Sequence, residues 1–144
     1  MDDHALLEYL RAQRWAIQAS NSAAHRPQAA IIRYVVTDRL ELVFDTLAGS
    51  RKVANLRANP NVALVIGGWQ DSSPRSLQLE GVADFPAGAE LARLKLAYCT
   101  AFPDGSLRES LPDITYVRVV PQWVRLSDYA SEPPSILERR IHPA

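Results

Sequence analysis

The chain has 144 residues, of which 47% are hydrophobic and 22% are charged. At about 150 residues per domain this length predicts a single domain over 1–144, and the composition excludes collagen-like, mucin-like, disordered and coiled-coil proteins. Lysine plus arginine total 16 and aspartate plus glutamate total 16, so the formal net charge is zero. Without a global positive field, the chain is not expected to bind nucleic acid or an acidic membrane surface.

The single cysteine, Cys99, cannot form a disulfide within the chain. No apolar run approaches the ~20 residues that a membrane span requires. The first residues, Met1 to His4, lack the basic and apolar segments of a signal peptide. These features together lead us to expect a cytoplasmic protein.

The first part of the chain predicts one helix followed by strands. Leucines at helical spacing predict a helix over 3–13, capped by Asp2 or Asp3. From Trp15 the period changes to two, which predicts a strand that leads into a polar loop over 21–28. The β-branched and aromatic runs 29–36 and 40–44 follow with three residues between them, and their closeness predicts a hairpin.

The middle of the chain predicts a short helix and another pair of strands. The helix covers about 50–58 and ends at Asn59-Pro60, because the residue before a proline avoids helical angles. Strands are predicted over 62–66 and 77–84, with the polar loop 70–75 between them.

The last part predicts a longer helix that Pro86 opens and Pro103-Asp104-Gly105 stops, then strands over 115–120 and 123–126, then a surface tail over 129–144. The total is about seven short strands and three helices, too few alternating units for a parallel sheet. The sequence therefore predicts a mainly β (α+β) protein, an antiparallel barrel with added helices.

The segment Phe44-Asp45-Thr46-Leu47-Ala48-Gly49-Ser50-Arg51-Lys52 is the most informative part of the chain. A strand ends there and a helix begins at Ser50, so Arg51 and Lys52 stand at the positive end of the helix dipole. An anion would reverse the unfavourable interaction, and a phosphate would receive backbone N–H groups, the Ser50 and Thr46 hydroxyls and both cations. The alternative is that both cations are ordinary solvated charges on the helix surface.

The same segment resembles part of a known protein family. Thr46 with Ser50-Arg51-Lys52, then Leu56, Asn59-Pro60 and Val62, resembles the flavin-phosphate segment of the pyridoxamine 5'-phosphate oxidase-like split-barrel family, and the strand 77–83 after Trp69 is similar to the family's strand. The resemblance covers roughly residues 5–128. It implies a homodimer of six- or seven-stranded split β-barrels that binds FMN in two clefts at the dimer interface.

The resemblance also implies the roles of particular residues. Arg51 and Lys52 would hold the FMN phosphate with help from Thr46 and Ser50, and the backbone of 31–33 would lie along the isoalloxazine. Ser76 or Gln78 would contact the cofactor from the facing strand, and Trp69 would either stack over the flavin or belong to the core or the dimer contact. The complete set of candidate cofactor residues is Thr46, Ser50, Arg51, Lys52, Ile31, Ile32, Arg33, Trp69, Ser76 and Gln78.

The function implied is that of an FMN-dependent oxidoreductase acting on an unidentified small molecule. The carboxy-terminal arginine-histidine set of the true oxidases is missing after Trp123, so the resemblance is to the short, general-stress-type branch. We predict no catalytic side chain, because the flavin carries the chemistry, and no metal site, because no ligand cluster has suitable spacing. The alternative is a non-catalytic protein that binds flavin, deazaflavin or haem, for which the histidines are His4, His25 and His142.

Overall fold

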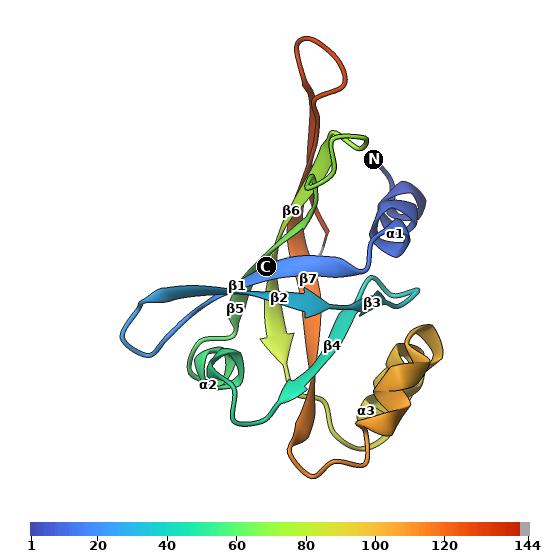
Figure 1. The fold of residues 1–144 in the computed structure, drawn as a ribbon. Helices are drawn as coiled ribbons and strands as arrows, with labels where there is room; N and C mark the ends of the chain where they lie inside the picture. Colours follow the sequence, from blue (N-terminus) through green and yellow to red (C-terminus); the bar gives the residue numbers. More distant parts are fainter. Residues whose placement is uncertain (142–144) are drawn as a thin grey trace.

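The computed structural model describes residues 1–141 as one curled antiparallel sheet with three α-helices (Figure 1). The helices are α1 (Asp3–Ala12), α2 (Arg51–Ala58) and α3 (Gly88–Ala101), and a 3-10 turn, η1 (Pro103–Leu107), follows α3. The strands are β1 (Trp15–Asn21), β2 (Pro27–Arg33), β3 (Val35–Val36), β4 (Leu42–Leu47), β5 (Asn61–Gly67), β6 (Arg75–Asp84), β7 (Ile114–Asp128) and β8 (Ser135–Arg140).

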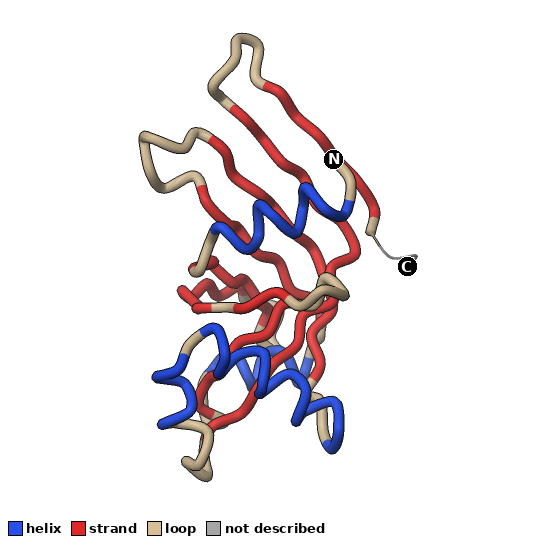
Figure 2. Tube along the Cα trace, turned by 90° about the vertical axis from the view of Figure 1, so that its right-hand side faces the viewer, coloured by secondary structure: helices blue, strands red, loops and turns tan. Residues whose placement is uncertain are grey.

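The strands follow the order β2-β1-β5-β6-β7-β4-β3, and β8 pairs with β7 beside this path. The sheet curls into a half-barrel, which confirms the predicted split-barrel fold. Figure 2 shows α1, which begins near the N label, lying across the strands of the upper part, with the other helices gathered at the lower end. Among the described residues, every helix is too short or too polar to cross a membrane.

Two of the predicted helices begin at the predicted cap. The Asp2 carboxylate accepts a hydrogen bond from the backbone N–H of Ala5 at 2.8 Å, and Ser50 Oγ accepts one from Val53 N at 3.4 Å. The third helix begins at Gly88, two residues after Pro86, and ends before Pro103. The capping signals thus placed the ends of α1 and α2 to within a residue or two.

The predicted hairpin between 29–36 and 40–44 is correct next to its turn and wrong beyond it. Strand β2 pairs along its whole length with β1, and the two residues of β3 pair with Val43 and Leu42. The run divides at Tyr34, whose N–H donates to Arg14 O at 3.0 Å and whose hydroxyl donates to Leu10 O at 2.7 Å. Tyr34 therefore separates β2 from β3, because its backbone N–H and its hydroxyl form hydrogen bonds with backbone carbonyls near the end of α1.

The predicted strands 115–120 and 123–126 are one continuous strand, β7, which pairs with β6, β4 and β8. A register shift between Glu80 and Gly81 leaves Gln122 of β7 without a partner on β6. A Cβ at Gly81 would lie 2.7 Å from Val120 O, so glycine is required for the close approach of the two backbones. The segment predicted as a surface tail contains β8, whose residues are mostly exposed.

The core has two parts on the two sides of β4 and β7. The larger part fills the half-barrel and includes Leu6 and Leu10 of α1, which are fully buried. The smaller part lies under α3 and consists of Val43, Leu94, Tyr98, Phe102 and Tyr116. Because successive residues of a strand point to opposite faces, β4 contributes to both parts and carries Asp45 and Thr46 to the edge between them.

Candidate functional site

The amino-terminal end of α2 concentrates positive charge. Its first turn contains Arg51 and Lys52 and no acidic residue. Ser50 Oγ lies 3.4 Å from Thr46 Oγ1, which brings the two hydroxyls to the same end of the helix. Within residues 1–141 neither cation forms an ion pair. The local field at this end therefore favours an anion.

A hollow of about 310 Å³ lies between this helix end and the β1–β2 hairpin. We refer to it as the helix-end hollow, and its lining residues are Gln18, Ser20, Gln28, Ala29, Ala30, Arg51 and Lys52. Its walls combine two cations with amide and hydroxyl groups, which are the donors that a phosphorylated ligand requires.

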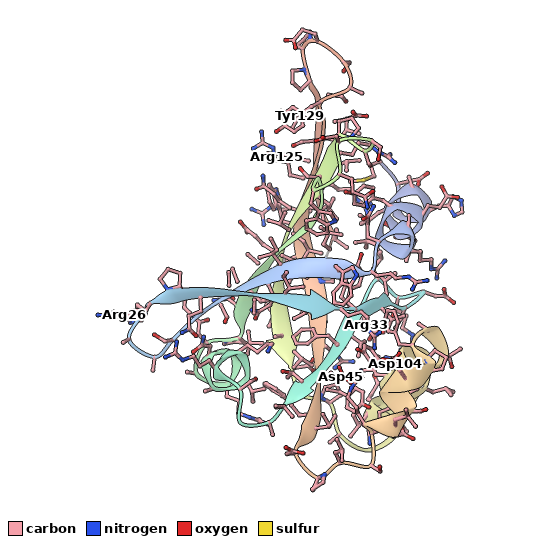
Figure 3. All side chains as sticks on the ribbon, in the orientation of Figure 1. Arg26, Arg33, Asp45, Asp104, Arg125 and Tyr129 are labelled. Atoms are coloured by element: carbon pink, nitrogen blue, oxygen red, sulfur yellow. The ribbon has the colours of Figure 1, made fainter. Side chains whose placement is uncertain are left out.

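A second hollow of about 350 Å³ adjoins the first, and Lys52 lines both. We refer to it as the sheet-edge hollow, and it is lined by Trp15, Ile31, Ile32, Arg33, Asp45, Thr46, Lys52, Tyr98, Asp104 and Arg108. Figure 3 shows the labelled Arg33, Asp45 and Asp104 close together where β2 ends beside α3. Six of the predicted cofactor residues line one or both hollows: Ile31, Ile32, Arg33, Thr46, Arg51 and Lys52.

Arg33 is held firmly in the wall of the sheet-edge hollow. Its Nη2 donates to Asp104 Oδ2 at 2.9 Å, and its Cζ lies 4.2 Å from the centre of the Phe102 ring. The hydrogen bond raises the pKa of Arg33 and lowers the pKa of Asp104, so both groups stay charged. The guanidinium is thus presented in one orientation.

A second ion pair adjoins the first. Arg108 Nη2 lies 3.1 Å from Asp45 Oδ2, and the Tyr98 hydroxyl donates to Asp45 Oδ1 at 3.0 Å. Burial raises the pKa of Tyr98, which therefore keeps its proton. Sequence reasoning missed all these partners, including Asp104, which it treated only as part of a helix stop. The sequence around that stop contains no pattern that points to Arg33.

Three of the remaining predicted residues, Trp69, Ser76 and Gln78, lie farther across the outer face of the sheet. Trp69 lines an apolar hollow with Trp15, Ile17 and Ile31, and it also lines another hollow that contains Ser76. Tyr129, labelled near the top of Figure 3, lines this last hollow too and was not predicted. Ser76 and Trp69 therefore face a different part of the surface from Arg51.

Gln78 and Ser50 line none of these hollows. Gln78 is exposed on β6, opposite Val65 on one side and Arg125 on the other. Ser50 caps α2, and this cap positions the first turn of the helix, whose Arg51 and Lys52 line the helix-end hollow.

Other reactive residues do not gather at the site. His25 lies in the exposed turn between β1 and β2, and His142 lies outside the described residues. Burial raises the pKa of the Cys99 thiol, whose Sγ is 3.8 Å from Glu109 Oε2, so the thiolate is disfavoured. In the part of the chain that the structure describes, no group of three or more His, Cys, Asp or Glu side chains could hold a metal ion.

Comparison with known proteins agrees with the fold. The family model described as pyridoxamine 5'-phosphate oxidase matches residues 2–128. A haem-binding protein from Mycobacterium smegmatis has a TM-score of 0.82 at 18% identity, and the match covers 97% of this chain but 58% of that protein.

Two further solved structures are similar. A protein of Clostridium acetobutylicum related to general stress protein 26, of the pyridoxine phosphate oxidase family, has a TM-score of 0.71 at 17% identity and is covered over 97% of its length by 98% of this chain. A haem storage protein from Vibrio cholerae also has a TM-score of 0.71 at 17% identity, over 82% of this chain and 88% of that one. A search of the curated proteins found no match.

Proposed function

This chain belongs to the pyridoxamine 5'-phosphate oxidase family, and from that premise we propose that it is an FMN-dependent oxidoreductase acting on a small molecule by hydride transfer through the flavin. When bound, FMN supplies the hydride or electron transfer itself, and the protein supplies binding, orientation and electrostatics. We propose no catalytic side chain, because both acids that line the sheet-edge hollow, Asp45 and Asp104, are engaged in ion pairs.

One observation carries the proposal: two cations stand at the positive end of α2 with no acidic residue in that turn. Placing positive charge there opposes the helix dipole by about 0.3–1 kcal/mol for each charge. A bound phosphate dianion reverses the sign of that interaction and accepts charge-assisted hydrogen bonds from Arg51 and Lys52. The arrangement is therefore explained by a phosphorylated ligand.

The residues of the two hollows suit the rest of FMN as well. The helix-end hollow would hold the phosphate and the chain attached to it, and Lys52 would lie where the two hollows meet. The isoalloxazine would lie along Ile31, Ile32 and Arg33 in the sheet-edge hollow. Arg33 would hold a positive charge at the edge of the ring, where it stabilises negative charge on a bound ligand.

We propose in addition that the protein is a homodimer whose cofactor sites lie at the interface. Large apolar side chains are exposed together on the outer face of the sheet: Trp15 at 51%, Ile17 at 38%, Ile31 at 70%, Val65 at 40% and Trp69 at 47%. Ile17 lies directly opposite Ile31 on one neighbouring strand and Val65 on the other, so the row is continuous. A second copy on this face would cover the row and bring its own Trp69 and Ser76 toward the hollows.

The alternative is a protein of the same fold that binds flavin, deazaflavin or haem without turnover. Two of the similar solved structures are haem proteins, which favours this alternative. Of the histidines among the described residues, neither His4 nor His25 lines these hollows. We place a flavin first because Arg51 and Lys52 in the helix-end hollow suit its phosphate.

An absorbance spectrum and a mass determination of the purified protein test the proposal. We expect a flavin spectrum and the mass of FMN after the ligand is released. Reducing the bound flavin and following its reoxidation by small-molecule acceptors then separates an oxidoreductase from a binding protein. A haem spectrum, or a protein that binds no added FMN, would exclude the proposal.

A further inference from the structure

A cluster of amide and hydroxyl side chains lies beneath the two cations of α2. We call it the amide cluster; it consists of Gln18 and Ser20 of β1, Gln28 of β2 and Asn55 of α2. Gln18, Ser20 and Gln28 also line the helix-end hollow. Gln18 is 1% exposed, Ser20 is 3% exposed and Asn55 is 5% exposed. These are polar groups withdrawn from solvent at the base of the proposed phosphate site.

Three members of the cluster satisfy one another. Asn55 Nδ2 donates one hydrogen bond to Ser20 Oγ at 3.2 Å and another to Gln28 Oε1 at 2.7 Å. Both N–H groups of the Asn55 amide are therefore used, and α2 is tied to both strands of the β1–β2 hairpin. This part of the cluster has a structural role.

Gln18 differs from its neighbours. Its Oε1 is buried and has no hydrogen-bond partner in the described structure. Inward-facing positions alternate along β1, and the preceding one is Ala16, so an apolar side chain would suit the fold at Gln18. A buried amide without a partner destabilises the folded protein. Because Gln18 lines the hollow, a turn of its terminal amide would present this oxygen to a ligand group there.

The chemistry of that group follows from the amide. A phosphate dianion only accepts hydrogen bonds, so it cannot satisfy Gln18 Oε1. A hydroxyl both donates and accepts, so it binds either end of the amide. Gln18 lies opposite Ala30 on β2, one residue before the predicted position of the ring. The hydroxyl would thus belong to the chain that joins the phosphate to the ring.

We infer that Gln18 binds a hydroxyl of the ligand's polyhydroxylated chain, and that it makes the site selective for phosphate esters of a polyol. This inference rests on the proposed function. Gln18 would then form a subsite that distinguishes the ribityl chain of FMN from a plain alkyl chain. Arg51 and Lys52 would bind the phosphate of either ligand.

The test compares two ligands and two proteins by titration of flavin fluorescence. The ligands are FMN and a flavin analogue whose side chain is a phosphorylated pentyl group without hydroxyls. In the unchanged protein FMN should bind more tightly than the analogue. In Gln18→Leu that preference should fall by about 5- to 10-fold, with the affinity for the analogue unchanged. Gln13→Leu, at the end of α1 and outside both hollows, is the matched control.

Melting temperatures show whether each variant is folded. Without ligand, Gln18→Leu should melt no lower than the unchanged protein, because it removes a buried polar atom without a partner. Gln18→Met, which keeps the unbranched shape, should give the same loss of preference. If Gln18→Leu weakens both ligands equally, or neither, the inference is wrong. If the unchanged protein binds neither flavin, the proposed function itself fails.

Discussion

Arg93 forms a bidentate ion pair with Glu41: Nη1 donates to Oε2 at 2.9 Å and Nη2 donates to Oε1 at 2.8 Å. The pair joins α3 to the chain just before β4, and Arg118 of β7 adds a further bond to the same carboxylate at 3.2 Å. Glu41 is 8% exposed. Hydrogen bonds from Arg93 and from the Thr37 hydroxyl, together with the charges of Arg93 and Arg118, lower the pKa of Glu41 from its ordinary 4.5 to about 2.

Glu41→Gln should therefore lower the free energy of unfolding by about 2 kcal/mol near neutral pH. Because the folded pKa lies below the unfolded one, the stabilisation is complete above pH 4.5 and is lost as the pH falls toward about 2. Urea unfolding across this range should show the difference between the two proteins shrinking to nothing. Asp38→Asn, which breaks the exposed pair with Arg11, should leave stability unchanged.

The cation pair at α2 predicts a large effect on flavin binding. Arg51→Gln with Lys52→Gln should weaken FMN binding by at least about 100-fold, because two charge-assisted hydrogen bonds are lost. Fluorescence titration measures this, and Arg57→Gln is the control, since Arg57 lies over the Phe85 ring. If the double variant binds FMN as tightly as the unchanged protein, Arg51 and Lys52 do not bind the phosphate.

The same double variant should be more stable than the unchanged protein when no ligand is bound. Removing two positive charges from the amino-terminal turn relieves an unfavourable interaction with the helix dipole, worth about 0.6–2 kcal/mol in total. Thermal unfolding should show a higher melting temperature for the double variant without FMN, and a smaller rise in melting temperature when FMN is added. A loss of stability in the ligand-free state would show that the two cations support the fold rather than the ligand.

Gly67 should tolerate no side chain. Its φ is +81°, and a Cβ there would collide with the Tyr9 hydroxyl, which donates to Ile66 O at 2.8 Å. Gly67→Ala should lower the free energy of unfolding by about 2–4 kcal/mol. Gly49→Ala, with nothing within 4 Å of the added carbon, should have little effect.

The collision at Gly67 can be tested in a Tyr9→Phe background, where the hydroxyl is absent. There the effect of Gly67→Ala on urea unfolding should be smaller than in the unchanged protein, because part of the clash is gone. Strict additivity of the two substitutions would show that backbone strain alone explains the requirement for glycine.

The outer face of the sheet predicts the oligomeric state. Ile17→Glu places a charge in the centre of the apolar row and should convert the dimer to a monomer in sedimentation experiments. Leu96→Glu is the control, because Leu96 is 70% exposed on α3 and outside the row. If the unchanged protein sediments as a monomer at working concentration, the proposed dimer is wrong.

Local sequence determined the parts of this protein that depend on neighbouring residues. Asp2 and Ser50 placed the starts of α1 and α2 because a cap acts on N–H groups only two or three residues away. Alternating residues identified the strands, and the step from Ser50 to Lys52 identified the charged helix end.

Tertiary structure alone decided the rest. The alternation of residues along a strand shows which side chains share a face, but it does not show which strand lies alongside. It therefore could not predict that β2 pairs with β1 instead of β4. Arg33 binds Asp104 from 71 residues away, and Gln18 lines the same hollow as Arg51 and Lys52 only because the fold brings β1 beside α2. Such contacts come from packing distant segments on a common core, and no local pattern encodes that arrangement.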